Sequence, residues 1–140
     1  MFDMNKNNVI ALTLVMMISY SCSKYDDGPF FSLRTKKGRL VGEWELDKLI
    51  QNGQTQSLDS DYDIIWEFER DGDFEQTLEY GSYSYGYNGD WEFDDNGEEL
   101  EIEINGYGTQ TFEINRLTNN ELWIEINDGG DKTEYEFEKN

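Results

Sequence analysis

The chain has 140 residues and a single cysteine, so it is long enough for one domain with its own core but cannot form an internal disulfide. Its 31 acidic and 11 basic residues give a net charge of −20, which argues against a nucleic-acid partner because phosphate binding requires clustered Lys and Arg. The sequence contains no histidine, the commonest general base, and no nucleophile elbow or phosphate-binding glycine loop. We therefore expect a protein that is not an enzyme and needs no cofactor.

A short apolar leader opens the chain. Residues 9–18 read Val-Ile-Ala-Leu-Thr-Leu-Val-Met-Met-Ile and follow a single cation, Lys6. This stretch is shorter than the roughly 20 apolar residues of a membrane-spanning helix. Residues 1–21 are therefore predicted to form a signal peptide that ends just before Cys22.

Cys22 directly follows this leader. Residues 19–21, Ser-Tyr-Ser, resemble the end of the sequence that lipoprotein signal peptidase recognises, with Ser19 at the position where Leu is usual. Residues 23–27, Ser-Lys-Tyr-Asp-Asp, resemble the Lys-then-two-acids export signal of surface lipoproteins in the Bacteroidetes. The resemblance implies lipidation of Cys22 by palmitate-type chains, attachment to the outer membrane and display on the cell surface. The alternative is that Cys22 is an incidental thiol in a cleaved leader.

Residues 22–40 are predicted to form a lipid-anchored tether with a charge of its own. They hold the one proline of the chain and a basic cluster, which consists of Arg34, Lys36, Lys37 and Arg39. From residue 41 onward, 5 basic residues stand against 28 acidic ones. Such an excess is typical of a solvated exterior that resists aggregation, and the alternative is recognition of a cationic partner or of divalent ions.

Apolar and acidic residues alternate with period two through residues 41–140, which is the pattern of half-buried β-strands. The alternating runs cover residues 43–47, 64–69, 73–80, 83–93, 99–104, 112–114, 122–126 and 134–138. Asn-Gly and Asp-Gly pairs, typical of tight hairpins, lie between many of them, as at residues 71–72, 96–97 and 105–106. The fold class is therefore predicted to be all-β, an up-and-down antiparallel meander of about eight strands that closes into a barrel and so removes its exposed edges.

Four segments of this region carry a family resemblance. Residues 40–44, Leu-Val-Gly-Glu-Trp, are similar to the Gly-x-Trp that begins lipocalins, and residues 65–74 resemble the aromatic strand, Asp-Gly turn and strand of lipocalin-like domains in Bacteroidetes lipoproteins. Residues 89–93, Gly-Asp-Trp-Glu-Phe, and the hairpin of residues 114–122 resemble later parts of the same domains. The resemblance spans about residues 39–138. It implies an eight-stranded barrel or half-barrel, and for most members no established ligand.

Aromatic residues supply the candidate ligand-binding site. Tyr83, Tyr85 and Tyr87 share one face of a strand, and tyrosine and tryptophan rings combine a flat apolar surface with one polar group. If this face points inward, it would line a cavity for a small apolar or sugar-like ligand. The candidate ligand-binding residues are Trp44, Trp66, Tyr80, Tyr83, Tyr85, Tyr87 and Trp91. The alternative is a packed aromatic core that fills a small barrel.

Three acids at alternate positions, Asp59, Asp61 and Asp63, are weak candidates for a calcium site. They lack the glycine and the bidentate acid that complete an EF-hand loop, so no metal is expected.

These predictions combine into a monomeric cell-envelope lipoprotein whose barrel binds a small apolar or sugar-like ligand. Its partners would be the membrane, through lipidated Cys22, and that ligand. The alternative is a non-enzymatic surface-interaction or structural protein with a filled barrel and an acidic exterior.

Overall fold

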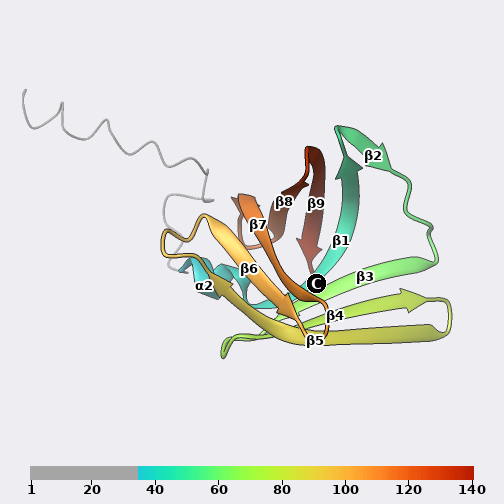
Figure 1. Ribbon diagram of the computed structural model, residues 1–140. Coiled ribbons are helices and arrows are strands. Elements are labelled where there is room, and N and C mark those ends of the chain that lie inside the picture. The colour runs from blue at the N-terminus through green and yellow to red at the C-terminus, as the bar shows by residue number, and fades with distance from the viewer. Residues whose placement is uncertain (1–34) are drawn as a thin grey trace, which may run out of the picture.

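The computed structural model describes residues 35–140, which form one closed antiparallel sheet and one short helix (Figure 1). The predicted signal peptide, Cys22 and residues 22–34 of the predicted tether lie outside the described residues. Within residues 35–140, no helix is long and apolar enough to cross a membrane. The elements in chain order are α2 (Lys36–Leu40), β1 (Gly42–Gln51), β2 (Gln54–Gln56), β3 (Tyr62–Phe68), β4 (Asp73–Tyr80), β5 (Tyr83–Phe93), β6 (Glu99–Ile104), β7 (Gly108–Leu117), β8 (Glu121–Asp128) and β9 (Asp131–Lys139).

The sheet closes on itself. Its strands follow the order β2-β1-β3-β4-β5-β6-β7-β8-β9, and β1 also pairs with β9. The strands from β3 to β9 together with β1 therefore form an eight-stranded up-and-down barrel, and β2 is an extra strand that folds back on the end of β1. The predicted fold class is confirmed.

Alternation along each strand separates an apolar interior from an acidic exterior. The ring of Trp66 packs against three phenylalanine rings of the core, with centroids 5.4 Å from Phe74, 5.7 Å from Phe112 and 4.8 Å from Phe137. Such offset and edge-on aromatic pairs add to the free energy gained from burying apolar area. The half of the barrel that contains these rings is filled by its own side chains, and we call it the closed half.

Helix α2 covers one end of the barrel, although the sequence placed residues 36–40 in the tether. Leu40 is fully buried, and the indole N–H of Trp44 donates to its carbonyl oxygen at 2.7 Å. The ammonium of Lys139, at the end of β9, donates to the carbonyl oxygens of Arg39 and Val41, both at 2.7 Å, and lies 4.8 Å from the centre of the Trp44 ring. Residues 36–40, the end of the predicted tether, are therefore anchored to the barrel by side chains that lie later in the chain.

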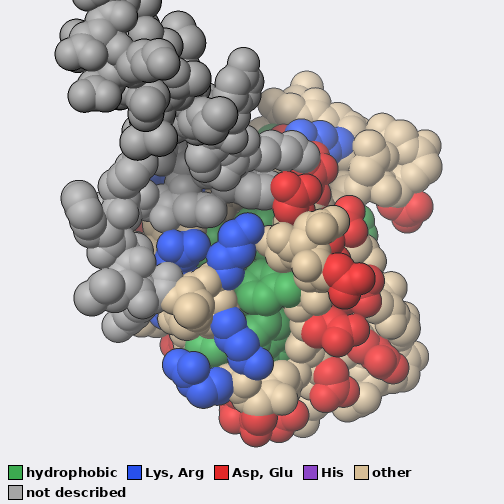
Figure 2. Space-filling model, turned by 90° about the vertical axis from the view of Figure 1, so that its left-hand side faces the viewer, with side chains coloured by type: hydrophobic (Ala, Val, Ile, Leu, Met, Phe, Trp, Pro, Cys, Tyr) green, Lys and Arg blue, Asp and Glu red, His purple; other side chains and the backbone are tan. Residues whose placement is uncertain are grey.

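Two lysines of the basic cluster, Lys36 and Lys37, have a structural role at this closed end. Lys36 donates to the carbonyl oxygen of Gly97 at 2.9 Å, and the ammonium of Lys37 lies 5.4 Å from the centre of the Trp91 ring. Figure 2 shows this side of the molecule, where Lys and Arg side chains surround a hydrophobic patch and acidic side chains crowd the adjoining wall.

The opposite end is open because β1 diverges from β3 and because β5 extends beyond β6. The pairing of β1 with β3 stops at Glu45 and Ile65, after which β1 pairs with β9 and β2, and the pairing of β5 with β6 stops at Gly89. In contrast, β4 pairs with β3 and β5 up to its last residue, Tyr80. The parts of β3, β4 and β5 beyond these points pair only with one another and form an overhang, seen at the lower right of Figure 1. The overhang consists of residues 62–64, 78–80 and 83–88.

Gly89 marks the point on β5 where the overhang leaves the closed barrel. A Cβ atom at this position would lie 1.8 Å from the backbone oxygen of Glu103. Only glycine allows β5 and β6 to approach this closely.

We expect Lys139→Met to weaken the closed end while keeping most of the side-chain volume. The carbonyl oxygens of Arg39 and Val41 would lose their charged donor, which typically costs about 1.5–3 kcal/mol. Urea unfolding followed by tryptophan fluorescence would measure this loss. Lys37→Met is the matched control, because it removes only an exposed cation–π contact of about 0.5–1 kcal/mol; equal losses in the two variants would contradict this role of Lys139.

Candidate functional site

The inward side of the overhang is lined by tyrosines in cross-strand rows. Tyr62, Tyr80 and Tyr83 lie directly opposite one another across β3, β4 and β5. The next row toward the closed end is Ile64, Leu78 and Tyr85, and the row after it is Trp66, Gln76 and Tyr87. Five of the seven predicted ligand residues, Trp66 and the four tyrosines, therefore lie on one continuous surface, which we call the tyrosine face.

These tyrosines are exposed although they point to the inward side. The exposed fractions are 50% for Tyr80, 65% for Tyr83 and 62% for Tyr85, while Tyr87 is half-buried. Inward positions of a small barrel are normally filled. The exposure arises because the pairing of β6 with β5 ends at Gly89 and because β1 turns away from β3 after Glu45 to pair with β9 and β2.

Two further tyrosines at this end were missing from the predicted set. Tyr62 is 38% exposed, and its ring centroid lies 5.9 Å from that of Tyr80. Tyr107, in the turn after β6, is 75% exposed and meets Tyr87 edge-on at 5.5 Å. The alternation at Tyr62 could have revealed the first, but only the folded chain brings Tyr107 to Tyr87.

Trp66 links the tyrosine face to the core and has an unsatisfied donor. The side chain is 6% exposed, and within the part of the chain that the structure describes its indole N–H has no hydrogen-bond acceptor. Buried polar groups in folded proteins nearly always have a partner, and leaving one without costs about 1–3 kcal/mol.

The other two predicted ligand residues lie apart from this surface. Trp44 and Trp91 are buried in the closed half, where their indole N–H groups donate to the backbone oxygens of Leu40 and Glu69. Their rings are covered by the ammonium groups of Lys139 and Lys37. Trp44 and Trp91 therefore lie at the closed end of the barrel and not at the open end.

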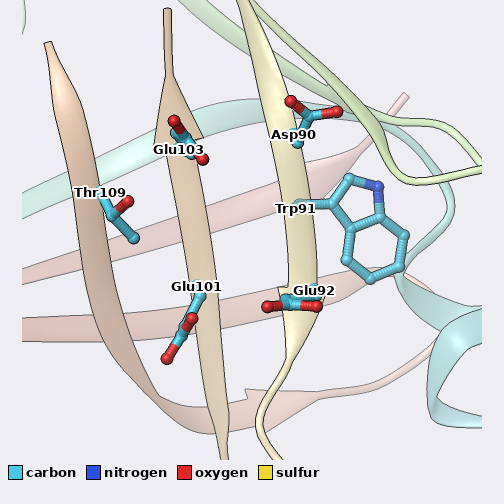
Figure 3. Close-up of a pocket in the computed structure, with 6 residues that line it drawn as sticks. All are labelled: Asp90, Trp91, Glu92, Glu101, Glu103 and Thr109. Atoms are coloured by element: carbon cyan, nitrogen blue, oxygen red, sulfur yellow. The ribbon is translucent and has the colours of Figure 1, made fainter.

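The outer wall is strongly acidic. A shallow hollow of about 270 Å³ lies over β5, β6 and β7, with Asp90 directly opposite Glu103 and Glu92 directly opposite Glu101. Figure 3 shows these carboxylates on the outer side of the strands, with the Trp91 ring turned away from them. Like charges in such pairs repel, so this wall does not itself stabilise the barrel.

The predicted metal candidates do not converge. Asp59 and Asp63 line a surface groove of about 290 Å³ beside β1, and Asp59 accepts the backbone N–H of Asp61 at 3.3 Å. Within residues 35–140, the three carboxylates whose oxygens lie within 4.8 Å of one another are instead Glu69, Asp71 and Asp73, all exposed around the β3–β4 turn. Repulsion from Asp71, with burial and Asp73 adding to it, raises the pKa of Glu69.

A closed eight-stranded up-and-down barrel with one filled end and one accessible end defines the class of this protein. The chain belongs to the lipocalin-like domain family, whose model matches residues 40–124, more than half of the sequence. The resemblance found in the sequence is therefore confirmed.

Among solved structures, the chain is similar to a protein from Bacteroides uniformis ATCC 8492 determined by NMR, with 19% sequence identity and a TM-score of 0.56. The match covers 74% of this chain and 90% of that one. At this identity the likeness shows the fold alone. No curated protein matches the sequence.

We expect Glu69→Gln to stabilise the protein at neutral pH. A carboxyl group whose pKa is raised in the folded state favours folding below its unfolded-state pKa, and this contribution is lost as the pH rises through the folded-state value. Removing the charge should therefore raise the thermal midpoint at pH 7, by on the order of 1 °C, and change little near pH 3. Differential scanning calorimetry at both pH values would measure this; a gain that persists unchanged at about 1 M salt, where such repulsion is screened, would contradict the electrostatic cause.

Proposed function

We propose that this protein is a cell-envelope lipoprotein, anchored through Cys22, whose barrel binds a small apolar or sugar-like ligand at its open end. The proposal is for binding without catalysis, by a monomer displayed on the outer membrane surface. The tyrosine face is the proposed binding surface, with Trp66 at its inner limit.

The observation that carries the proposal is the unsatisfied indole N–H of Trp66. This donor lies at the border between the filled core and the exposed tyrosines, one row below Tyr85. A ligand that enters the open end and accepts a hydrogen bond from this N–H would offset the free-energy cost of burying the donor without a partner. The half-buried apolar side chains of Ile64 and Leu78, in the row between, would contact the body of such a ligand.

The position of α2 supports the anchoring part of the proposal. The predicted tether joins the barrel at Thr35, next to α2 at the closed end. An anchor at Cys22 would therefore connect to the barrel at its closed end and not at the overhang. This arrangement suits a barrel that takes its ligand from outside the envelope.

A second candidate is a surface-interaction or structural protein with a filled barrel. The aromatic cluster around Trp66 favours it, because the rings of Phe68, Phe74, Phe112 and Phe137 already occupy the closed half. The two candidates differ in whether the open half holds a ligand.

We expect Tyr85→Ala to reduce ligand binding without unfolding the domain, because this ring is 62% exposed. Native mass spectrometry of protein purified from an exporting host, and then supplied with lipid and glycan pools, should show a retained mass on the wild type that is largely lost in the variant. Ser84→Ala is the matched control, since it alters the neighbouring residue on the other face of β5. A clean apo mass under all conditions would favour the filled barrel.

We expect Cys22→Ala to abolish anchoring. The wild-type protein should incorporate radiolabelled palmitate and sediment with the membrane fraction, whereas the variant should do neither, since its acyl chains would supply the membrane affinity. Protease treatment of intact cells would test surface display. Unlabelled wild-type protein in the soluble fraction would show that Cys22 is an incidental thiol.

A further inference from the structure

We infer that the ligand of the open end is uncharged and enters with an oxygen acceptor foremost, which accepts a hydrogen bond from the indole N–H of Trp66. This inference rests on the proposed function and deepens it by naming the chemical class of the ligand. Three features of the inward surface support it.

The first feature is the direction of the unmet hydrogen bond. An indole has one N–H donor and no acceptor, so only an acceptor can satisfy it. The neighbouring rings of Phe74, Phe112 and Phe137 offer no oxygen. The ring of Tyr135 lies 5.9 Å from that of Trp66, but its hydroxyl does not accept from the indole N–H. The complementary group on the ligand is therefore a carbonyl, ether or hydroxyl oxygen, or a carboxylate.

The second feature excludes the carboxylate. Among the lysines and arginines of β1 to β9, only Lys139 lies on the inward side, opposite Trp44 at the closed end, where its ammonium donates to the carbonyl oxygens of Arg39 and Val41. Alternation and register place the others, Lys48, Arg116 and Lys132, on the outer side. The one buried cation among the described residues, Arg39, belongs to α2 at the closed end. An anionic head group beside Trp66 would be buried without a counter-charge, inside a chain of net charge −20.

The third feature is the chemistry of the neighbouring inward positions. Gln76 lies directly opposite both Trp66 and Tyr87 and is half-buried. Its amide both donates and accepts, which suits a carbonyl or a hydroxyl group. Beyond this row, Ile64, Leu78 and Tyr85 present an apolar surface. The ligand is thus a neutral molecule with a polar leading end and a flat or apolar body.

Two dyes of similar size test the charge preference and the hydrogen bond to Trp66 separately. The first is a neutral naphthalene ketone, whose emission moves to longer wavelength when its carbonyl accepts a hydrogen bond, and the second is an anilinonaphthalene sulfonate. Fluorescence titration of the purified protein should show that the ketone binds at least about tenfold more tightly than the sulfonate. The emission of the bound ketone should be that of a hydrogen-bonded carbonyl.

Trp66→Phe removes the N–H donor and keeps an aromatic ring. It should weaken ketone binding by about tenfold, shift the bound emission to shorter wavelength and leave sulfonate binding unchanged. Trp123→Phe is the matched control, because Trp123 lies on the outer side of β8, against the guanidinium of Arg116 at 5.0 Å. If Trp66→Phe does not fold, Gln76→Met provides a second variant that removes the polar partner and keeps a similar volume.

The outcomes distinguish this inference from the proposed function. Equal affinity for the two dyes, tighter binding of the sulfonate, or unchanged ketone emission in Trp66→Phe would overturn the inference while leaving a ligand-binding barrel. Failure of both dyes to bind, together with a clean apo mass in native mass spectrometry, would overturn both and indicate a filled barrel.

Discussion

The pairing of β1 with β9 is the constraint on which the rest of the structure depends. These two strands, from opposite ends of the domain, pair from Trp44 and Lys139 to Gln51 and Thr133 and close the sheet. Closure removes two exposed edges and creates an inside that no outward side chain reaches. A chain of net charge −20 can therefore hold an interior built from apolar and aromatic side chains.

Closure also shows where the stability comes from. On the outer wall, acids face acids across neighbouring strands, as Asp90 faces Glu103 and Glu92 faces Glu101. Such pairs oppose folding, so the free energy must come from the interior, where aromatic rings pack around Trp66. The acids keep the outer surface solvated at a cost that the aromatic core offsets.

One end of the barrel is covered and the other is open, because different elements surround them. At one end, α2 is held by the Trp44 indole and the Lys139 ammonium, which together satisfy the carbonyl groups at the end of the helix. At the other end, β1 diverges from β3 and β5 extends beyond β6, which leaves inward-facing tyrosines in contact with solvent. The two ends of the barrel therefore present different surfaces, one covered by α2 and one lined by exposed tyrosines.

The sequence by itself indicated eight of the strands and which residues of each strand share a face, because alternation is a property of neighbouring positions. Its short motifs indicated the family. It placed Tyr83, Tyr85 and Tyr87 on one face, and it separated the acids from that face. Only the tertiary structure decided which inward residues are covered, because that depends on how far neighbouring strands pair. Trp44 is covered by a helix that the sequence assigned to the tether, whereas Tyr83 and Tyr85 are exposed because β6 ends its pairing with β5 at Gly89. The missing acceptor of Trp66 likewise results from contacts between strands far apart in the chain, which no local pattern encodes.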